Sequence, residues 1–359
     1  MIHIIYTGGT IGMVRRGDGA LEPASIEDLL KYVPELDMLG EWDYATLEPP
    51  RDSVDLGPPD WIAMARHIGQ RYDRYDGFVI LHGTDTMVYS AAALSFLLEG
   101  LHKPVIFTGA QLPIGAIRND ARNNLITAIE LAASHHPQVN EVGIYFDDVL
   151  LRGNRAMKTS IFAFNAFASP NFPPLARVGV YIRYPSLPPR PPQPSQLTVH
   201  QRLSSDVALV KLFPGITPHL LAALIDAPIR GLVLETFGSG NIPATPGLVE
   251  VIAQAVKERG LLTVAITQQQ QGMVELNTYA AGRRLLDAGV VSGRDMTSST
   301  ALVKLMFLLA QENLSPQERR QLLARNLRGE LTPTPTSISD DSSHIFQSRP
   351  VQNSDTAVP

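Results

Sequence analysis

The sequence contains no cysteine, and this absence removes several kinds of chemistry at once. Disulfide bonds, thiolate zinc sites, iron–sulfur clusters and cysteine nucleophiles are all excluded. The same absence leaves the redox compartment of the protein open. Any active site must therefore rest on other side chains.

Charged residues are also sparse, at 18% of the chain with a net charge of -5. A globular protein carries about 25% charged residues, and a nucleic-acid-binding protein usually presents a basic surface. We therefore expect no nucleic acid partner. Hydrophobic residues make up 44% of 359 residues, which excludes disorder as the main state. At about 150 residues per domain, the length predicts two domains.

No segment has the pattern of a signal peptide or a membrane span. Residues 1–6 (MIHIIY) run directly into a glycine turn, without a basic region or a cleavage site. The longest apolar stretches, such as residues 301–310, are far shorter than the ~20 residues that a membrane span requires. We expect a soluble, cytoplasmic protein with no membrane partner.

From residue 1 to residue 184, short apolar runs alternate with helical periodicities, a pattern typical of parallel βαβ units. The runs are nearly continuous in apolar residues, as in strands that are buried on both faces. We expect strands at 2–6, 78–81, 105–108, 142–146 and 178–182, and helices at 60–71, 89–99 and 123–133. The pattern predicts an α/β fold with a larger, doubly wound parallel-sheet domain.

Six of the ten residues 185–194 are proline, which favours extended backbone over a helix or a central strand. We expect a linker at 185–204 and a smaller C-terminal α/β domain at 205–331. Its expected strands are 207–212, 231–235 and 262–266, and its expected helices lie near 218–224 and 248–258.

A helix is predicted over residues 300–311, and it should pack one apolar stripe onto the smaller domain. The stripe recurs at i, i+3, i+4 and i+7: Leu302, Leu305, Met306 and Leu309. Residues 332–359 lack both periodicity and apolar content. We expect them to form a disordered tail.

Three predicted strands end in loops of a similar kind. These are residues 7–12 (TGGTIG), 82–87 (HGTDTM) and 108–113 (TGAQLP). In an open parallel sheet the ligand lies outside the carboxyl ends of the strands, and glycine lets the backbone approach it closely. We expect the hydroxyls and the carboxylate of these loops to point into one crevice.

Simpler interpretations of these loops stay open. A glycine turn after a first strand commonly binds a phosphate, but Gly8, Gly9 and Gly12 lack the G-x-G-x-x-G spacing and the P-loop ending. Alternatively, Thr10 and Thr84 only cap the helices that follow them.

The sequence gives little support for a hydrolase elbow or a metal site. Residues 238–240 (GSG) have the wrong spacing for a G-x-S-x-G elbow, and no metal site is expected because adjacent His135 and His136 would face different directions. Only six lysines are present. Lys158 follows the fourth predicted strand and could reach the crevice edge near Thr84 and Asp85. Taken alone, it could equally be a surface lysine.

Residues 7–12 and 82–87 closely resemble the two signatures of bacterial-type L-asparaginases. They lie 75 residues apart, each at a strand end, which makes the match specific. The resemblance spans residues 1 to about 333, and its later parts look most like the cytoplasmic type I branch. Beyond the two signatures, the stretches that carry the resemblance are 52–55 (DSVD), 152–155 (RGNR) with Lys158, 167–171 (FASPN) and 326–333 (NLRGELTP).

The resemblance implies hydrolysis of L-asparagine to L-aspartate and ammonia, sometimes with L-glutamine as a side substrate, and without metal or cofactor. Matched position by position, it implies that Thr10 is the nucleophile on a mobile loop. Thr84, Lys158 and Asp85 would form a second, rigid cluster.

The resemblance also implies a set of substrate contacts. Asp85 would bind the α-ammonium group, Ser53 with Asp52 beside it would hold the α-carboxylate, and the backbone at Ala110 would meet the side-chain amide. Asn241 would contact substrate across a dimer or line a separate effector site. Alternatively, this asparagine simply tolerates a left-handed turn. The family likeness implies a homodimer or a dimer of dimers, that is, a homotetramer.

The chemistry is coherent with these roles, because an amide is a poor electrophile and a threonine hydroxyl is a weak nucleophile. A lysine acts as a base only when neutral, and lowering the pKa of a lysine from about 10.4 to near 7 costs roughly 4–5 kcal/mol. An ionised Asp85 opposes that change. We therefore expect a neutral Lys158 only when the substrate ammonium occupies Asp85.

One departure from the family concerns a tyrosine that often follows the first threonine by about ten residues. Residues 17–21 (GDGAL) stand there in this chain, and the only tyrosine nearby, Tyr32, is expected to be a packing residue in a helix. Another group replaces that tyrosine, or turnover is reduced, or Thr10 and Thr84 divide the work differently.

Two alternative functions remain. One is an amidotransferase subunit that releases ammonia for transfer-RNA modification. Such subunits usually carry an extra N-terminal domain, whereas here the first signature begins at residue 7. The other is a non-catalytic amino-acid sensor that keeps the pocket, and the missing tyrosine is its only support.

Overall fold

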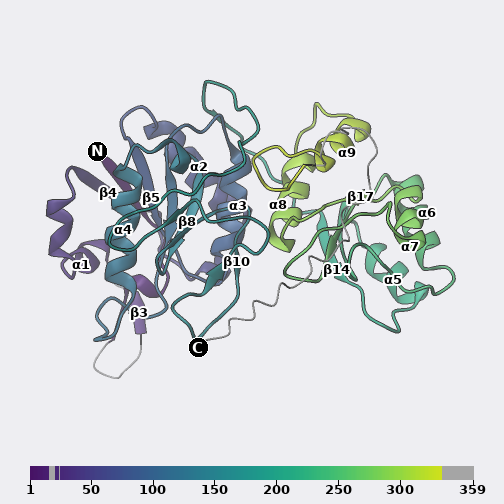
Figure 1. The fold of residues 1–359 in the computed structure, drawn as a ribbon, viewed down its shortest axis with the longest axis horizontal. Coiled ribbons are helices and arrows are strands. Elements are labelled where there is room, and N and C mark those ends of the chain that lie inside the picture. The colour runs from purple at the N-terminus through teal and green to yellow at the C-terminus, as the bar shows by residue number, and fades with distance from the viewer. Residues whose placement is uncertain (16–20, 24, 334–359) are drawn as a thin grey trace, which may run out of the picture.

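The computed structural model describes residues 1–15, 21–23 and 25–333. The chain forms a larger N-terminal lobe and a smaller C-terminal lobe, each built on its own sheet (Figure 1). In this described part of the chain, no helix is long and apolar enough to cross a membrane.

The larger sheet has seven strands, and five of them form a continuous parallel array. Only β9 runs against its two neighbours, β8 and β12. In spatial order the strands are β12 (Ala176–Arg177), β9 (Val149–Arg152), β8 (Val142–Phe146), β7 (Val105–Thr108), β5 (Gly77–Leu81), β1 (Ile2–Tyr6) and β4 (Trp42–Thr46). The four inner parallel strands match the predicted apolar runs, which confirms those predictions.

The predicted strand at 178–182 is wrong. The chain instead turns between Arg177 and Arg183, which pair with each other as an isolated bridge. Val180 and Tyr181 are 93% and 75% exposed, so this apolar run is not a buried strand. The run follows the edge strand β12, where the sheet offers no further neighbour to cover it.

Helices cover both faces of the larger sheet. α2 (Pro58–Arg71) and α3 (Met87–Leu97) pack on one face, and α1 (Ile26–Leu30) and α4 (Ala121–Ala133) pack on the other. Successive residues of β1 alternate between the two cores: Ile5 joins α2 and α3, whereas Ile4 joins α4. This arrangement confirms the predicted doubly wound α/β domain.

The smaller sheet contains four parallel strands, of which the first three were predicted and the last, β17, was not. They are β14 (Val207–Lys211), β15 (Gly231–Thr236), β16 (Leu262–Thr267) and β17 (Val291–Ser292). The helices of this lobe are α5 (Pro218–Ile225), α6 (Leu248–Arg259), α7 (Ala280–Asp287) and α9 (Pro316–Ala324). The predicted boundaries at 184, 204 and 331 stay predictions.

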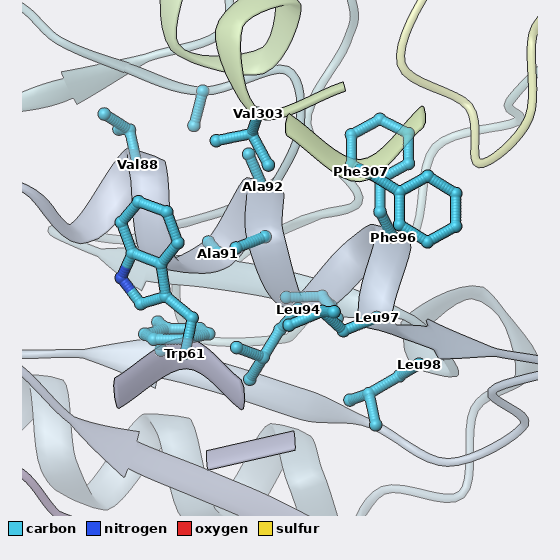
Figure 2. Packing of buried hydrophobic residues seen from close by; sticks show 14 of the residues in the cluster. Trp61, Val88, Ala91, Ala92, Leu94, Phe96, Leu97, Leu98, Val303 and Phe307 are labelled. Atoms are coloured by element: carbon cyan, nitrogen blue, oxygen red, sulfur yellow. The ribbon is translucent and has the colours of Figure 1, made fainter. Parts of the chain in front are cut away.

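The helix α8 (Ser298–Leu309) lies between the two lobes (Figure 1). Figure 2 shows Val303 and Phe307 of α8 against α3, where the rings of Phe96 and Phe307 stack with centroids 5.7 Å apart. The opposite face of α8 lies against β15. Leu309 of α8 packs so closely on Gly231 of β15 that a Cβ built on this glycine would be 2.8 Å from the leucine side chain. The helix therefore joins the two cores.

The apolar stripe predicted for this helix faces the smaller lobe, where Leu305 and Leu309 lie beside Gly231, but it is not the helix's only buried face. Leu302 and Met306 are only half-buried, whereas Val303, Lys304 and Phe307 are buried. A periodicity of apolar residues identifies one buried face, and α8 has two because both lobes cover it.

The segment after α9 also connects the lobes, because Arg155 of the larger lobe donates its Nε to the Gly329 carbonyl at 2.8 Å. Glu330 forms an ion pair of 2.6 Å with Lys304, and both side chains are fully buried. Thr332, the first residue of the predicted tail, donates its hydroxyl to Asp295 at 2.5 Å. Beyond 333, the predicted disordered tail lies outside the described residues.

Shorter elements complete the fold. They are the 3-10 turns η1 (Thr10–Gly12), η2 (Pro34–Met38), η3 (Ser53–Asp55) and η4 (Pro137–Val139), and the strands β2 (Met13–Arg15), β3 (Leu21–Pro23), β6 (Leu98–Glu99), β10 (Met157–Lys158), β11 (Phe167–Ala168) and β13 (Thr198–Val199).

Candidate active site

The candidate site lies at the carboxyl ends of the parallel strands. β1 lies between β4 and β5, and all three run in the same direction. The loops that follow them therefore emerge at one edge of the sheet. The chain order changes direction at β1, which is where α/β sheets bind ligands.

Three glycines allow these loops to touch. A Cβ built on Gly9, where φ is 89°, would lie 2.4 Å from the amide nitrogen of Gly83. A Cβ on Gly83 would lie 2.7 Å from the Ser53 hydroxyl, and one on Gly8 would lie 2.2 Å from the Arg51 carbonyl. Only glycine permits such contacts, so the loops after β1, β4 and β5 pack backbone against backbone.

Lys158 lies within hydrogen-bond distance of the loop after β5. Its Nζ is 2.9 Å from Thr84 Oγ1 and 2.5 Å from Asp85 Oδ1. The Lys158 side chain is 14% exposed, whereas that of Asp85 is 58% exposed. A largely buried amine is thus held by one hydroxyl and by a carboxylate that still faces solvent.

The loop after β7 supplies a residue that the sequence interpretation missed. Ala110 is 1% exposed, as expected for a backbone contact, and the next residue, Gln111, accepts a 3.4 Å hydrogen bond from Thr84 through its Oε1. The Gln111 amide also donates to the Ala163 carbonyl at 3.1 Å. Its place in the strand-end loop was the available signal, but both partners are distant in sequence.

Ser53, Asp52 and Thr10 border the same loops. Ser53 is 1% exposed, and its carbonyl accepts a 2.5 Å hydrogen bond from Thr86. Asp52 is exposed and accepts the amide of Val54, which caps η3. Thr10 is half-buried at the start of η1, directly after the Gly9 contact.

His82 supports the loop after β5 from below. Its Nδ1 donates to the Gly83 carbonyl at 2.7 Å, and its Nε2 accepts from the Ser90 hydroxyl at 2.8 Å. Complete burial lowers the pKa of His82 to about 4. The imidazole is therefore neutral at physiological pH and fixes the backbone beside Thr84.

One predicted site residue lies apart from this cluster. Asn241 is in the smaller lobe, where it pairs with Phe237 across a turn. Among the described hydrogen bonds, none joins Asn241 to Thr84, Asp85 or Lys158. Tyr32 lies beyond the end of α1 rather than in the helix, and it is 49% exposed, with its ring beside Gly115. Residues 16–20, where the family tyrosine would fall, lie outside the described part of the chain.

No metal ligands gather in the described part of the chain. Across residues 1–15, 21–23 and 25–333, no group of three or more His, Asp or Glu side chains could hold a metal ion.

The chain belongs to the asparaginase family. The family model "Asparaginase, N-terminal" matches residues 1–189, and the model "Glutaminase/Asparaginase C-terminal domain" matches residues 206–323. Within that family, the chain is 42% identical to L-asparaginase 1 of Escherichia coli (strain K12) over 335 residues, which cover 92% of this chain and 98% of that protein. The predicted resemblance to the L-asparaginase family and its type I branch is confirmed.

A solved structure and a second kind of relative complete the comparison. L-asparaginase I from Vibrio cholerae is 40% identical, with a TM-score of 0.84 over 92% of this chain and 98% of that one. A glutamyl-tRNA(Gln) amidotransferase component from Pyrococcus horikoshii is 37% identical over 92% of this chain and 77% of that protein. The amidotransferase relative is thus the more distant one.

Proposed function

We propose that the protein hydrolyses L-asparagine to L-aspartate and ammonia, with Thr10 as the nucleophile. The observation that carries the proposal is the contact of Lys158 Nζ with both Thr84 and Asp85 at the strand ends. The 42% identity to an L-asparaginase supports the same substrate. We propose L-glutamine as a weak side substrate and the cytoplasm as the place of action.

In this proposal, different loops bind different groups of the amino acid. The solvent-facing carboxylate of Asp85 binds the α-ammonium, and Ser53 with Asp52 holds the α-carboxylate. The backbone at Ala110 then meets the side-chain amide. The exposure of Asp85 supports its role, because a carboxylate must keep an open side to accept a cation from a ligand.

The acyl transfer needs two steps. The Thr10 hydroxyl oxygen attacks the amide carbon, the C–N bond breaks, and the hydroxyl proton passes to the amide nitrogen, which leaves as ammonia and gives an ester at Thr10. Water then attacks the ester: one of its protons passes through Thr84 to Lys158, and the other passes to the Thr10 oxygen as the ester C–O bond breaks. This step releases L-aspartate as a carboxylate and restores the Thr10 hydroxyl, and Lys158 then returns its proton to solvent.

The position of Asp85 couples binding to this chemistry. Its Oδ1 is 2.5 Å from Lys158 Nζ, so the carboxylate already forms an ion pair with the amine. A substrate ammonium that binds the same carboxylate competes with Lys158 for it. Substrate binding therefore weakens the ion pair that holds the amine beside Thr84.

We propose that the chain works as a homodimer or a dimer of dimers in which Asn241 contacts substrate bound to the neighbouring copy. Exposed apolar side chains on loops beside the site support an interface there. Ile161 and Phe162, on the loop after Lys158, are 70% and 92% exposed, and Ile117 on the loop after Gln111 is fully exposed. Such patches commonly mark protein contacts.

The experiment that tests the proposal is an ammonia assay on L-asparagine and L-glutamine side by side, with wild type and Thr10→Ala. We expect release from asparagine by the wild type and loss of release in the variant. Binding of asparagine without release would favour the alternative of an amino-acid sensor. Release from glutamine alone would favour the amidotransferase alternative.

A further inference from the structure

We infer that Gln111 is a positioning residue that sets the direction of the Thr84 hydroxyl in the proton path to Lys158. This inference rests on the proposed amide hydrolysis. The Gln111 side chain lies between two segments of the site. Its Oε1 is 3.4 Å from Thr84 Oγ1, and its Nε2 is 3.1 Å from the Ala163 carbonyl oxygen.

The Ala163 carbonyl determines which way the Gln111 amide faces. A carbonyl oxygen only accepts hydrogen bonds, so the amide NH₂ must face Ala163 and the amide oxygen must face Thr84. The Thr84 hydroxyl then donates to Gln111 and offers its lone pairs to Lys158 Nζ at 2.9 Å. The hydrogen bonds therefore run in one direction, from Lys158 through Thr84 and Gln111 to Ala163.

Two members of this chain of hydrogen bonds, Gln111 and Ala163, are held in place by further hydrogen bonds of their own backbone amides. The backbone amide of Gln111 donates to both carboxylate oxygens of Asp120, at 3.1 and 2.9 Å, and Asp120 is 9% exposed. The amide of Ala163 donates to Ser160 Oγ at 3.0 Å. Ala163 lies on the connection between β10 and β11. Gln111 thus joins the loop after β7 to the hairpin that carries Lys158.

This arrangement determines how the proton moves. The 3.4 Å bond from Thr84 to Gln111 is long and is easily given up. When Lys158 is neutral, the Thr84 O–H bond breaks, an Nζ–H bond forms, and the Thr84 oxygen takes the proton of the attacking water. The hydrogen bond to Gln111 sets the direction of the Thr84 hydroxyl before this transfer, and it forms again once the Thr84 oxygen holds the proton of the water. Two carboxylates are hydrogen-bonded to members of this path: Asp85 contacts Lys158 Nζ, and Asp120 accepts the backbone amide of Gln111.

Two variants and one control test the inference. Gln111→Met keeps the length of the side chain but removes both hydrogen bonds, whereas Gln111→Glu keeps an acceptor and adds a negative charge. Gln138→Met is the control, because the Gln138 amide also ties two backbone carbonyls, those of Leu175 and Pro185, but lies away from the site. Ammonia release is measured as kcat and KM from about pH 5 to 10, and thermal unfolding verifies the fold.

We expect Gln111→Met to lower kcat about tenfold with KM within threefold, because a positioning loss acts on the reaction step. Gln111→Glu should move the acidic limb of the kcat profile up by about one pH unit, because the new charge favours the ammonium. The control should match wild type. A kcat of Gln111→Met within twofold of wild type, with an unmoved limb in Gln111→Glu, would overturn the inference.

A second measurement separates this inference from the proposed function. Only six lysines are present, so ¹³C-lysine NMR can follow Lys158 directly, with Lys158→Arg to assign its signal. We expect the Lys158 signal to move in Gln111→Glu and to stay in place in Gln138→Met. An inactive wild type would contradict the proposed function alone, whereas an unmoved Lys158 signal in Gln111→Glu would contradict the positioning role.

Discussion

The two ends of the larger sheet each carry a hydrogen-bonded cluster of titratable side chains. At the amino end, His3 of β1 bonds Asp43 of β4 through Nδ1, and its Nε2 is 2.8 Å from the Nε2 of His67 on α2. Tyr75 donates to Asp43 at 2.5 Å. At the carboxyl end, Lys158 contacts Thr84 and Asp85.

The amino-end cluster contains the more familiar catalytic groups, yet the histidine at its centre is buried. The His3 side chain is 3% exposed, its ring stacks on Tyr75 with centroids 4.6 Å apart, and both of its nitrogens already have partners. At the carboxyl end, the glycine contacts bring loops together while Asp85 stays 58% exposed. The position of a residue on solvent-facing loops that converge at the strand ends is therefore a better guide to the site than the presence of histidine.

We expect the largest difference between the two ends of the sheet in the activity of variants of Lys158 and His67. Lys158→Arg keeps the charge but cannot shed a proton, so we expect kcat to fall by roughly 10²–10⁴-fold, the range of a lost general base. At the other end of the sheet, His67→Gln should leave kcat within about twofold. Steady-state ammonia release from L-asparagine measures both. Turnover of Lys158→Arg at the wild-type rate would refute the role of Lys158 as the base.

A second variant tests the glycine contacts. Gly83→Ala places a Cβ 2.7 Å from the Ser53 hydroxyl and 2.8 Å from its Cβ, so one of the two loops must move. A displacement of about 1 Å can cost about 100-fold, and we expect kcat/KM to fall ten- to a hundredfold. Gly179→Ala is the control, because a Cβ there meets no atom within 4 Å. Equal activity of the two variants would show that the contact does not organise the site.

A third variant moves to the amino end, where the expected effect is on stability. Asp43→Asn removes one acceptor from the buried His3 and Tyr75 pair, so the free energy of unfolding should fall by about 1–2 kcal/mol. Asp73→Asn, at an exposed position, should change it little. Urea unfolding with a parallel kcat measurement tests this expectation. A loss of kcat at unchanged stability would mean that the amino-end cluster takes part in catalysis.

The smallest expected effect is a pH dependence that both ends share. Burial lowers the pKa of His82 to about 4, against an ordinary value near 6.5. It lowers the pKa of His67, which is less completely buried, to about 4 as well. The unfolded chain therefore binds more protons between pH 6.5 and 4, so stability is complete above 6.5 and falls as the pH falls through that window. His82 alone should account for about 1 kcal/mol of loss between pH 7.5 and 5.5.

The test compares His82→Gln with wild type by urea unfolding at pH 7.5 and 5.5. The variant is expected to be less stable at pH 7.5 but to lose less on acidification. An unchanged difference between the two pH values would mean that His82 is not held neutral in the folded chain.

The sequence predicts the inner part of the fold well because β1, β5, β7 and β8 are continuous apolar runs. It misses β4, whose residues are half-buried at the sheet edge, and it misplaces a strand at 178–182, where the apolar run is exposed. Local periodicity reports burial only where neighbours exist on both sides.

The candidate site, like the fold, could be predicted from the sequence only in part. The approach of Lys158 to Thr84 could be expected from strand-end topology together with a family resemblance. The contact of Gln111 with Ala163 could not, because it depends on a carbonyl 52 residues away in the chain. The amino-end cluster was missed for the same reason, since 40 residues separate His3 from Asp43. Polar contacts between distant segments leave no periodic trace in a sequence.

A crystal structure with L-aspartate bound would test the central claim most directly. We predict the α-ammonium on Asp85 and the side-chain carboxyl carbon about 3 Å from the Thr10 hydroxyl, as a reacting pair requires. Aspartate bound elsewhere, or with its side-chain carbon nearer to the Thr84 hydroxyl than to that of Thr10, would contradict the account.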